Sequence, residues 1–163
     1  MKLLCPSLFD LNLYQNEQRR WVKLAEGAYG IVYEVDTGMA DPKQVAIKKM
    51  ALPQSIYDRC VLHDIFNEIT CLEEFRLEHC VTDLYDYGVS EDSYYIVMKR
   101  YATSLREWRL KQAPNMHDNL SLYLSIFREI LKCFKTIHSH QVTHYDIKCD
   151  NILIDFKNQE KSG

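Results

Sequence analysis

Hydrophobic and polar residues alternate along the first part of the chain. From Trp21 to Val35 the pattern has a period of two and is interrupted by "EGAYG", which predicts two strands joined by a glycine-containing turn. A second turn, "DTGMADP", precedes a third apolar run, "QVAIKKM", which has Lys48 at its centre. We therefore expect three antiparallel strands at the start of the fold.

The period then changes. Between Tyr57 and Phe75 apolar residues recur at steps of three and four, which predicts an amphipathic helix. Two further strands are expected at Leu84–Tyr87 and Tyr94–Met98. Thr103 or Ser104 can cap a helix that continues to about Lys111. Together with a final long helix, this pattern predicts an α+β fold in two lobes.

The long helix is expected to begin at Asp118 or Ser121 and to end near His140. Its apolar side chains cover more than one stripe, so the helix needs burial on most sides. No further helices that could bury it follow in this sequence. We therefore expect an apolar patch that favours association, for example with a partner chain that covers the helix.

Composition narrows the class of protein. The 163 residues are 47% hydrophobic and 26% charged, as in a globular domain, and the net charge of −3 gives no reason to expect nucleic acid as a partner. No run approaches the roughly 20 apolar residues of a membrane span. Six cysteines without a CxxC pair or a signal peptide indicate reduced thiols, so we expect a cytoplasmic protein, with the nucleus as the alternative.

Two polar features lie in the strand-rich region. Gly27 and Gly30 allow the backbone of the "EGAYG" turn to approach a ligand, and such turns can cover phosphates. Lys48 lies in an apolar strand and needs a charged partner. Glu68 follows it by 20 residues on the predicted helix. Taken alone, the pair is better explained as a structural ion pair.

A third feature lies near the C-terminal end, in "HYDIKCDNILID". Asp146, Lys148 and Asn151 bring a carboxylate, an ammonium group and an amide to one loop. Phosphoryl transfer needs an acceptor for the hydroxyl proton, a cation near the γ-phosphate and an oxygen ligand for Mg²⁺. The three side chains can supply these functions in that order.

These motifs together resemble the eukaryotic-type protein kinase domain. "LAEGAYGIV" is similar to its glycine-rich loop, "VAIK" to the strand with the phosphate-binding lysine, and "YYIVMKRY" to the strand that leads into the hinge. The resemblance implies ATP and Mg²⁺ as cofactors. It places at the nucleotide Leu24, Ala25, Glu26, Gly27, Ala28, Tyr29, Gly30, Val32, Ala46, Lys48, Glu68, Met98, Lys99 and Tyr101.

In the catalytic loop, the resemblance implies that Asp146 is the catalytic base, Lys148 the phosphate-facing lysine and Asn151 a metal ligand. Lysine two residues after the aspartate is the form found in serine/threonine kinases. The amino-acid sequence of the loop, "DIKCDNILID", is most similar to that of kinases that head MAP-kinase cascades and of tyrosine-kinase-like kinases. The expected substrate is therefore a serine or threonine of a protein.

The sequence departs from the family pattern at three places. Ala25 replaces the first glycine, and Tyr145 replaces the arginine that meets an activation-loop phosphate, which argues against that switch. After Asp155 the expected Asp-Phe-Gly, activation segment and Ala-Pro-Glu do not appear before Gly163. Since that aspartate is the family's main Mg²⁺ ligand, we expect weak or no activity from these residues alone.

The resemblance implies a lead-in segment at 1–20 and a kinase domain at 21–163. Within that domain we expect a small lobe at about 21–98, a hinge at about 99–102 and part of a helical lobe at 103–163. Three hypotheses remain. The chain is an ATP-dependent serine/threonine kinase, a catalytically silent relative that binds nucleotide or a partner, or an interaction module that docks through its long helix.

Overall fold

A computed structural model of the chain describes residues 14, 21–27, 30–52, 59–78, 80–90, 93–112 and 119–155. They form two compact units, Met1–Arg100 and Tyr101–Gly163. Most of the lead-in expected at 1–20, the candidate helix start Asp118 and the residues after Asp155 fall outside the described residues.

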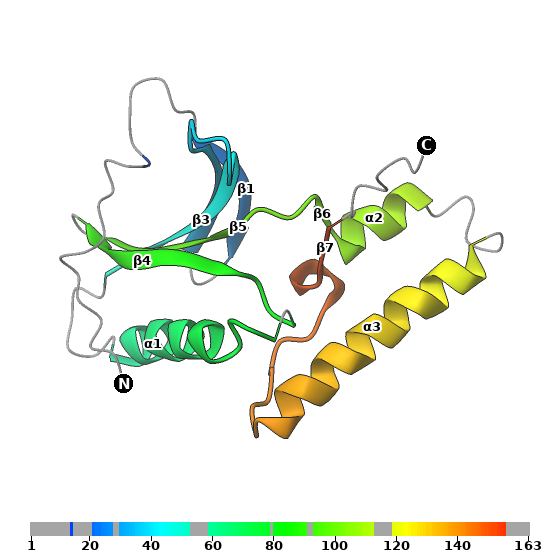
Figure 1. The fold of residues 1–163 in the computed structure, drawn as a ribbon. Helices are drawn as coiled ribbons and strands as arrows, with labels where there is room; N and C mark the ends of the chain where they lie inside the picture. Colours follow the sequence, from blue (N-terminus) through cyan, green and yellow to red (C-terminus); the bar gives the residue numbers. More distant parts are fainter. Residues whose placement is uncertain are drawn as a thin grey trace. The chain divides into compact units, whose positions relative to one another are not determined.

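A five-stranded antiparallel sheet dominates the first unit (Figure 1). The strands follow the order β1-β2-β3-β5-β4 across the sheet. This confirms the three strands expected at the start and the two expected later. The bounds are β1 Trp21–Gly27, β2 Gly30–Asp36, β3 Gln44–Ala51, β4 Leu84–Ser90 and β5 Ser93–Lys99.

Helix α1 (Arg59–Glu74) lies along one face of this sheet (Figure 1). The three- and four-residue pattern predicted a helix between Tyr57 and Phe75. The described part of this range forms a helix from Arg59 to Glu74, and Tyr57 lies outside the described residues. Its apolar stripe packs against strands β3, β4 and β5, which explains the expected period. This first core consists of Met50, Ile65, Ile69, Leu72, Leu84, Tyr94 and Ile96.

A second core covers the opposite face of the sheet, because alternate strand residues point to opposite sides. Its buried members are Tyr14, Val35, Val45, Ile47, Tyr95 and Val97. Tyr14 comes from the segment expected only as a lead-in. Its hydroxyl donates to Asp86 at 3.4 Å, and its carbonyl accepts from the Trp21 indole at 2.9 Å. Burial raises the pKa of Tyr14 to about 12.

The second unit is mainly helical. Strand β6 (Thr103–Ser104) leads into α2 (Leu105–Gln112), and α3 (Leu120–Ser139), the short 3-10 helix η5 (Cys149–Asn151) and strand β7 (Leu153–Ile154) follow. The Ser104 hydroxyl accepts from the Glu107 N–H at 3.2 Å, which confirms a cap at the start of α2. Sheet and helices together confirm the expected α+β class.

Helix α3 is apolar around much of its circumference, as its sequence predicts. One side meets α2, where the rings of Trp108 and Tyr123 lie 5.2 Å apart between centroids. Among the residues of α3, only Ile137 is buried. Its exposed large apolar side chains are Leu120, Leu122, Leu124, Phe127 and Leu131. No helix among the described residues has the length and apolarity needed to cross a membrane.

Candidate nucleotide and phosphoryl-transfer site

The glycine-containing turn joins β1 to β2 with Gly27 opposite Gly30. Gly30 has a φ of +137°, and a Cβ there would lie 2.9 Å from Met50 Cγ and nearer still to the Lys49 carbonyl oxygen. Only glycine fits that position without displacing β3. Gly27 has nothing within 4 Å of such a Cβ. Ala28 and Tyr29, expected at the tip of the turn, lie outside the described residues.

Lys48 and Glu68 form a close ion pair between β3 and α1. The Lys48 ammonium donates to both Glu68 carboxylate oxygens, at 2.8 and 2.6 Å. The side chains are 18% and 35% exposed. Partial burial makes this charge-assisted bond stronger than a fully solvated one. A cavity of about 210 Å³ adjoins the pair, lined by Lys48, Met50, Val61, Asp64, Ile65 and Glu68.

Three residues expected at adenine share the sheet face that carries Lys48. Val32 pairs with Lys48, and Ala46 pairs with Met98 in the next strand. Since alternate residues of a strand share a face, these side chains form one apolar surface beside Lys48. Ala46 is buried, and Val32 and Met98 are half-buried.

The remaining expected nucleotide residues lie at the edge of the sheet and after β5. The register of β1 shifts between Lys23 and Ala25, so Leu24 lies at the irregularity, and it is 40% exposed. Glu26 forms an exposed ion pair with Lys23. Lys99 ends β5 and donates its N–H to the Asp83 carbonyl at 2.9 Å. Tyr101 begins the second unit.

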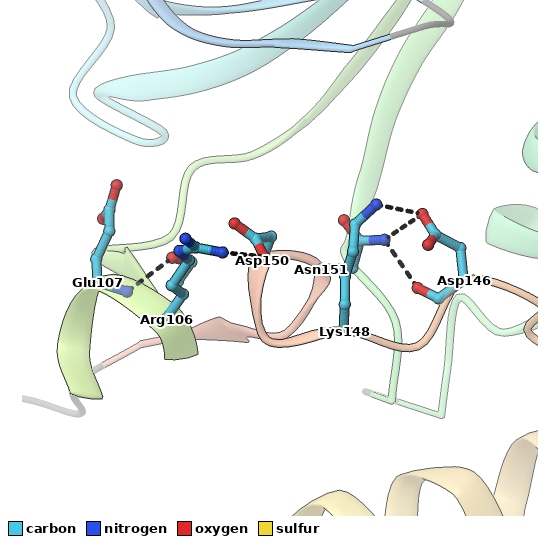
Figure 2. Close-up of polar contacts among 7 residues, drawn as sticks. Arg106, Glu107, Asp146, Lys148, Asp150 and Asn151 are labelled. Atoms are coloured by element: carbon cyan, nitrogen blue, oxygen red, sulfur yellow. Dashed lines mark hydrogen bonds and ion pairs between the residues drawn. The ribbon is translucent and has the colours of Figure 1, made fainter. Parts of the chain in front are cut away.

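Asp146, Lys148 and Asn151 come together in the second unit (Figure 2). Lys148 donates to Asp146 Oδ2 at 2.7 Å, and the Asn151 amide donates to the same oxygen and to the Asp146 carbonyl, both at 2.9 Å. The bonds from Lys148 and then Asn151 lower the pKa of the Asp146 carboxyl, and the bond to Asp146 raises the pKa of Lys148. The loop thus holds an ionised carboxylate in solvent.

Local backbone contacts fix the shape of this loop. His144 Nδ1 accepts from the Asp146 N–H at 3.2 Å, and the Asn151 N–H donates to the Lys148 carbonyl at 2.9 Å. Beyond the loop, β7 pairs with β6, and Leu105 donates to the Ile152 carbonyl at 2.7 Å. The Asp146 loop is therefore tied to the start of α2. Arg106 adds an exposed contact to Asp150 at 3.4 Å (Figure 2).

The donor set fits a nucleotide better than a metal ion. In the first unit, the glycine turn and Lys48 suit phosphates. In the described ranges, no group of three His, Cys, Asp or Glu side chains could hold a metal. Asn151 has its amide N–H groups on Asp146, which leaves Oδ1 as its oxygen ligand. This oxygen is the group through which Asn151 could contribute to an Mg²⁺ site.

Sequence reasoning missed one ion pair on the Lys48 face of the sheet. Arg100 donates from Nε to Glu34 Oε2 at 2.6 Å, although 66 residues separate them. Tyr145, by contrast, was singled out as a departure and is 95% exposed. The signal for Glu34 was its even position on β2, which places it on the same face as Val32.

Known proteins resemble this chain in sequence. The protein kinase domain family matches residues 19–161. A probable serine/threonine-protein kinase of Dictyostelium discoideum is 42% identical over 154 residues, which cover 94% of this chain and 6% of that protein. The chain thus spans a small part of the length of this relative. Because the family match covers most of the sequence, and the sheet, the Lys48–Glu68 pair and the Asp146 loop accompany it, the chain belongs to the protein kinase domain family.

Proposed function

We propose that the kinase domain to which these residues belong binds ATP and transfers its γ-phosphoryl group to a serine or threonine hydroxyl of a protein. The observation that carries the proposal is the Asp146 carboxylate, held ionised by Lys148 and Asn151. Lys148 and Asn151 both bond to Oδ2, so Oδ1 can accept a hydrogen bond from a hydroxyl and then its proton as the hydroxyl oxygen attacks phosphorus.

Each residue of the set has a defined task in this proposal. Lys48, oriented by Glu68, binds the α- and β-phosphates, and the turn at Gly27 and Gly30 covers them. Lys148 stabilises charge on the transferred group as the bond to the ADP oxygen breaks. Asn151 offers an oxygen to Mg²⁺, which neutralises phosphate charge when bound.

Calorimetric titration with Mg·ATP tests the nucleotide part. Lys48→Ala should abolish measurable binding, because the phosphates lose their cation. Lys49→Ala is the matched control, since Lys49 lies next along β3 and its ammonium lies 5.7 Å from the centroid of the Tyr95 ring, on the opposite face. Equal loss of binding in both variants, or binding unaffected by Lys48→Ala, would contradict the proposal.

Phosphate transfer to a mixed Ser/Thr peptide library tests the catalytic part in the same samples. Asp146→Asn should lower the rate by roughly 10²- to 10⁴-fold, the usual share of a general base. Lys48-dependent binding without any transfer would instead identify a catalytically silent nucleotide-binding relative, the second hypothesis.

A second candidate function is partner binding through α3. The observation that favours it is the exposed apolar stripe Leu120, Leu124, Phe127 and Leu131, with exposures of 62%, 61%, 60% and 53%. These positions recur at steps of four and three along one side of the helix. Phe127→Lys should lower the mass measured in solution by light scattering if a second chain covers this stripe.

A further inference from the structure

One face of the sheet carries two ion pairs with an apolar surface between them. The even-numbered residues of β2, β3 and β5 share this face, because the register places Val32 opposite Lys48, and Glu34 and Met98 on either side of Ala46. The Lys48–Glu68 pair lies on one side of Val32, Ala46 and Met98. The Glu34–Arg100 pair lies on the other.

The second ion pair is short and partly shielded from solvent. Arg100 Nε donates to Glu34 Oε2 at 2.6 Å, and the side chains are 26% and 24% exposed. Gln44 Nε2 donates to the other carboxylate oxygen of Glu34 at 3.3 Å. Glu34 on β2 is thus held by the first residue of β3 and by the residue that follows β5.

This arrangement fixes the backbone at the point where β5 ends. Val45 pairs with Lys99, the last residue of the strand, and the ladder stops there. The Lys99 N–H donates to Asp83 on one side. On the other side, Arg100 is connected across β3 to Glu34. The segment that would present the Lys99 carbonyl to adenine is therefore restrained from both sides.

We propose that Glu34 and Arg100 are a positioning pair for the adenine base, which they serve by holding the Lys99–Arg100 backbone and closing the outer edge of the Val32–Ala46–Met98 surface. This inference rests on the proposed function, since it requires ATP to lie on this face. The pair acts through the backbone and not by touching the phosphates. Its loss should weaken binding of the base alone as much as binding of the whole nucleotide.

Calorimetry with adenosine and with Mg·ATP separates these effects. Glu34→Arg and Arg100→Glu should each weaken the affinity for both ligands by about threefold to tenfold, because each places like charges together and releases the backbone. The double variant Glu34→Arg/Arg100→Glu should restore most of the affinity by rebuilding the pair in reverse. Glu34→Gln removes the charge without placing like charges together, so the fold should be kept and the affinity for both ligands should fall by a smaller factor.

Hydrogen–deuterium exchange without ligand gives an independent measurement. Peptides that span residues 98–101 should exchange faster in the single variants and return to the original rate in the double variant. Glu73→Arg is the matched control, since it breaks the exposed Glu73–Arg76 pair of the same unit with the same change of charge. It should leave both the affinities and the exchange of residues 98–101 unchanged.

Two outcomes would overturn the inference, and they differ from each other. If the unchanged chain binds Mg·ATP through Lys48 but Glu34→Arg leaves adenosine affinity and exchange as they were, the positioning role is wrong and the proposed function stands. If the unchanged chain binds neither adenosine nor Mg·ATP, the positioning role is wrong together with the proposed function.

Discussion

The Lys48–Glu68 pair and the Asp146–Lys148 pair use the same chemistry in different surroundings. Their shortest nitrogen–oxygen distances are 2.6 and 2.7 Å. The first pair joins two elements that pack on a common core, and Lys48 is 18% exposed. The second lies within a few residues of one loop, and its side chains are 52% and 65% exposed.

The difference indicates what each pair can do. A half-buried pair is weakly screened and depends on the packing that surrounds it, so it couples a binding residue to the stability of the fold. An exposed pair contributes little to stability. Its effect is on the protonation and orientation of its own members. We therefore expect changes in the sheet unit to alter folding and changes in the loop to alter chemistry.

The largest effect on folding should come from Gly30→Ala. The added Cβ would collide with the Lys49 carbonyl and Met50 at a φ of +137°, and we expect a loss of about 3 kcal/mol in the free energy of unfolding. This corresponds to a melting temperature lower by roughly 6–12 °C. Gly27→Ala is the matched control, because nothing lies within 4 Å of its Cβ position. Equal melting temperatures for the two variants would refute the packing argument.

An intermediate effect should come from removing the lysine of the half-buried pair, and no effect from removing the lysine of the exposed pair. Lys48→Met leaves the Glu68 carboxylate partly buried without its cation, which should cost about 1–2 kcal/mol and lower the melting temperature by roughly 2–8 °C. Lys148→Met should not change the melting temperature, since its partner stays hydrated. A scan by differential scanning calorimetry compares the two. A larger shift for Lys148→Met would reverse the comparison.

The same contrast explains what the sequence could predict. The strands followed the two-residue period and the helices followed the three- to four-residue period. Burial of one face of each element sets both patterns. The Asp146 loop could be predicted because its contacts are local. Glu34–Arg100 could not, since a charged residue on a strand resembles any solvated residue until the register brings its partner close. Tyr14 likewise fills a core from a segment without a periodic pattern.

The smallest effect on the free energy of unfolding is expected from a change in the protonation of Asp146. This change bears most directly on the proposed phosphoryl transfer. Hydrogen bonding from Lys148 is the largest cause that lowers the pKa of this carboxyl. Lys148→Met should therefore raise the pKa of Asp146 toward its ordinary value, and Asn151→Ala should raise it less. Carboxyl carbon chemical shifts measured against pH by NMR report this directly.

The direction of the pH dependence follows from the role of Asp146 as the proton acceptor. Asp146 accepts a proton only when ionised, so a higher pKa moves the acid limit of phosphate transfer to higher pH. Glu129 is an internal reference, because its pKa is lowered by a comparable exposed bond from Lys132 and should not respond to Lys148→Met. If Lys148→Met leaves the pKa values of both Asp146 and Glu129 unchanged, Lys148 does not lower the pKa of Asp146. The role of the lysine would then be limited to binding the phosphate.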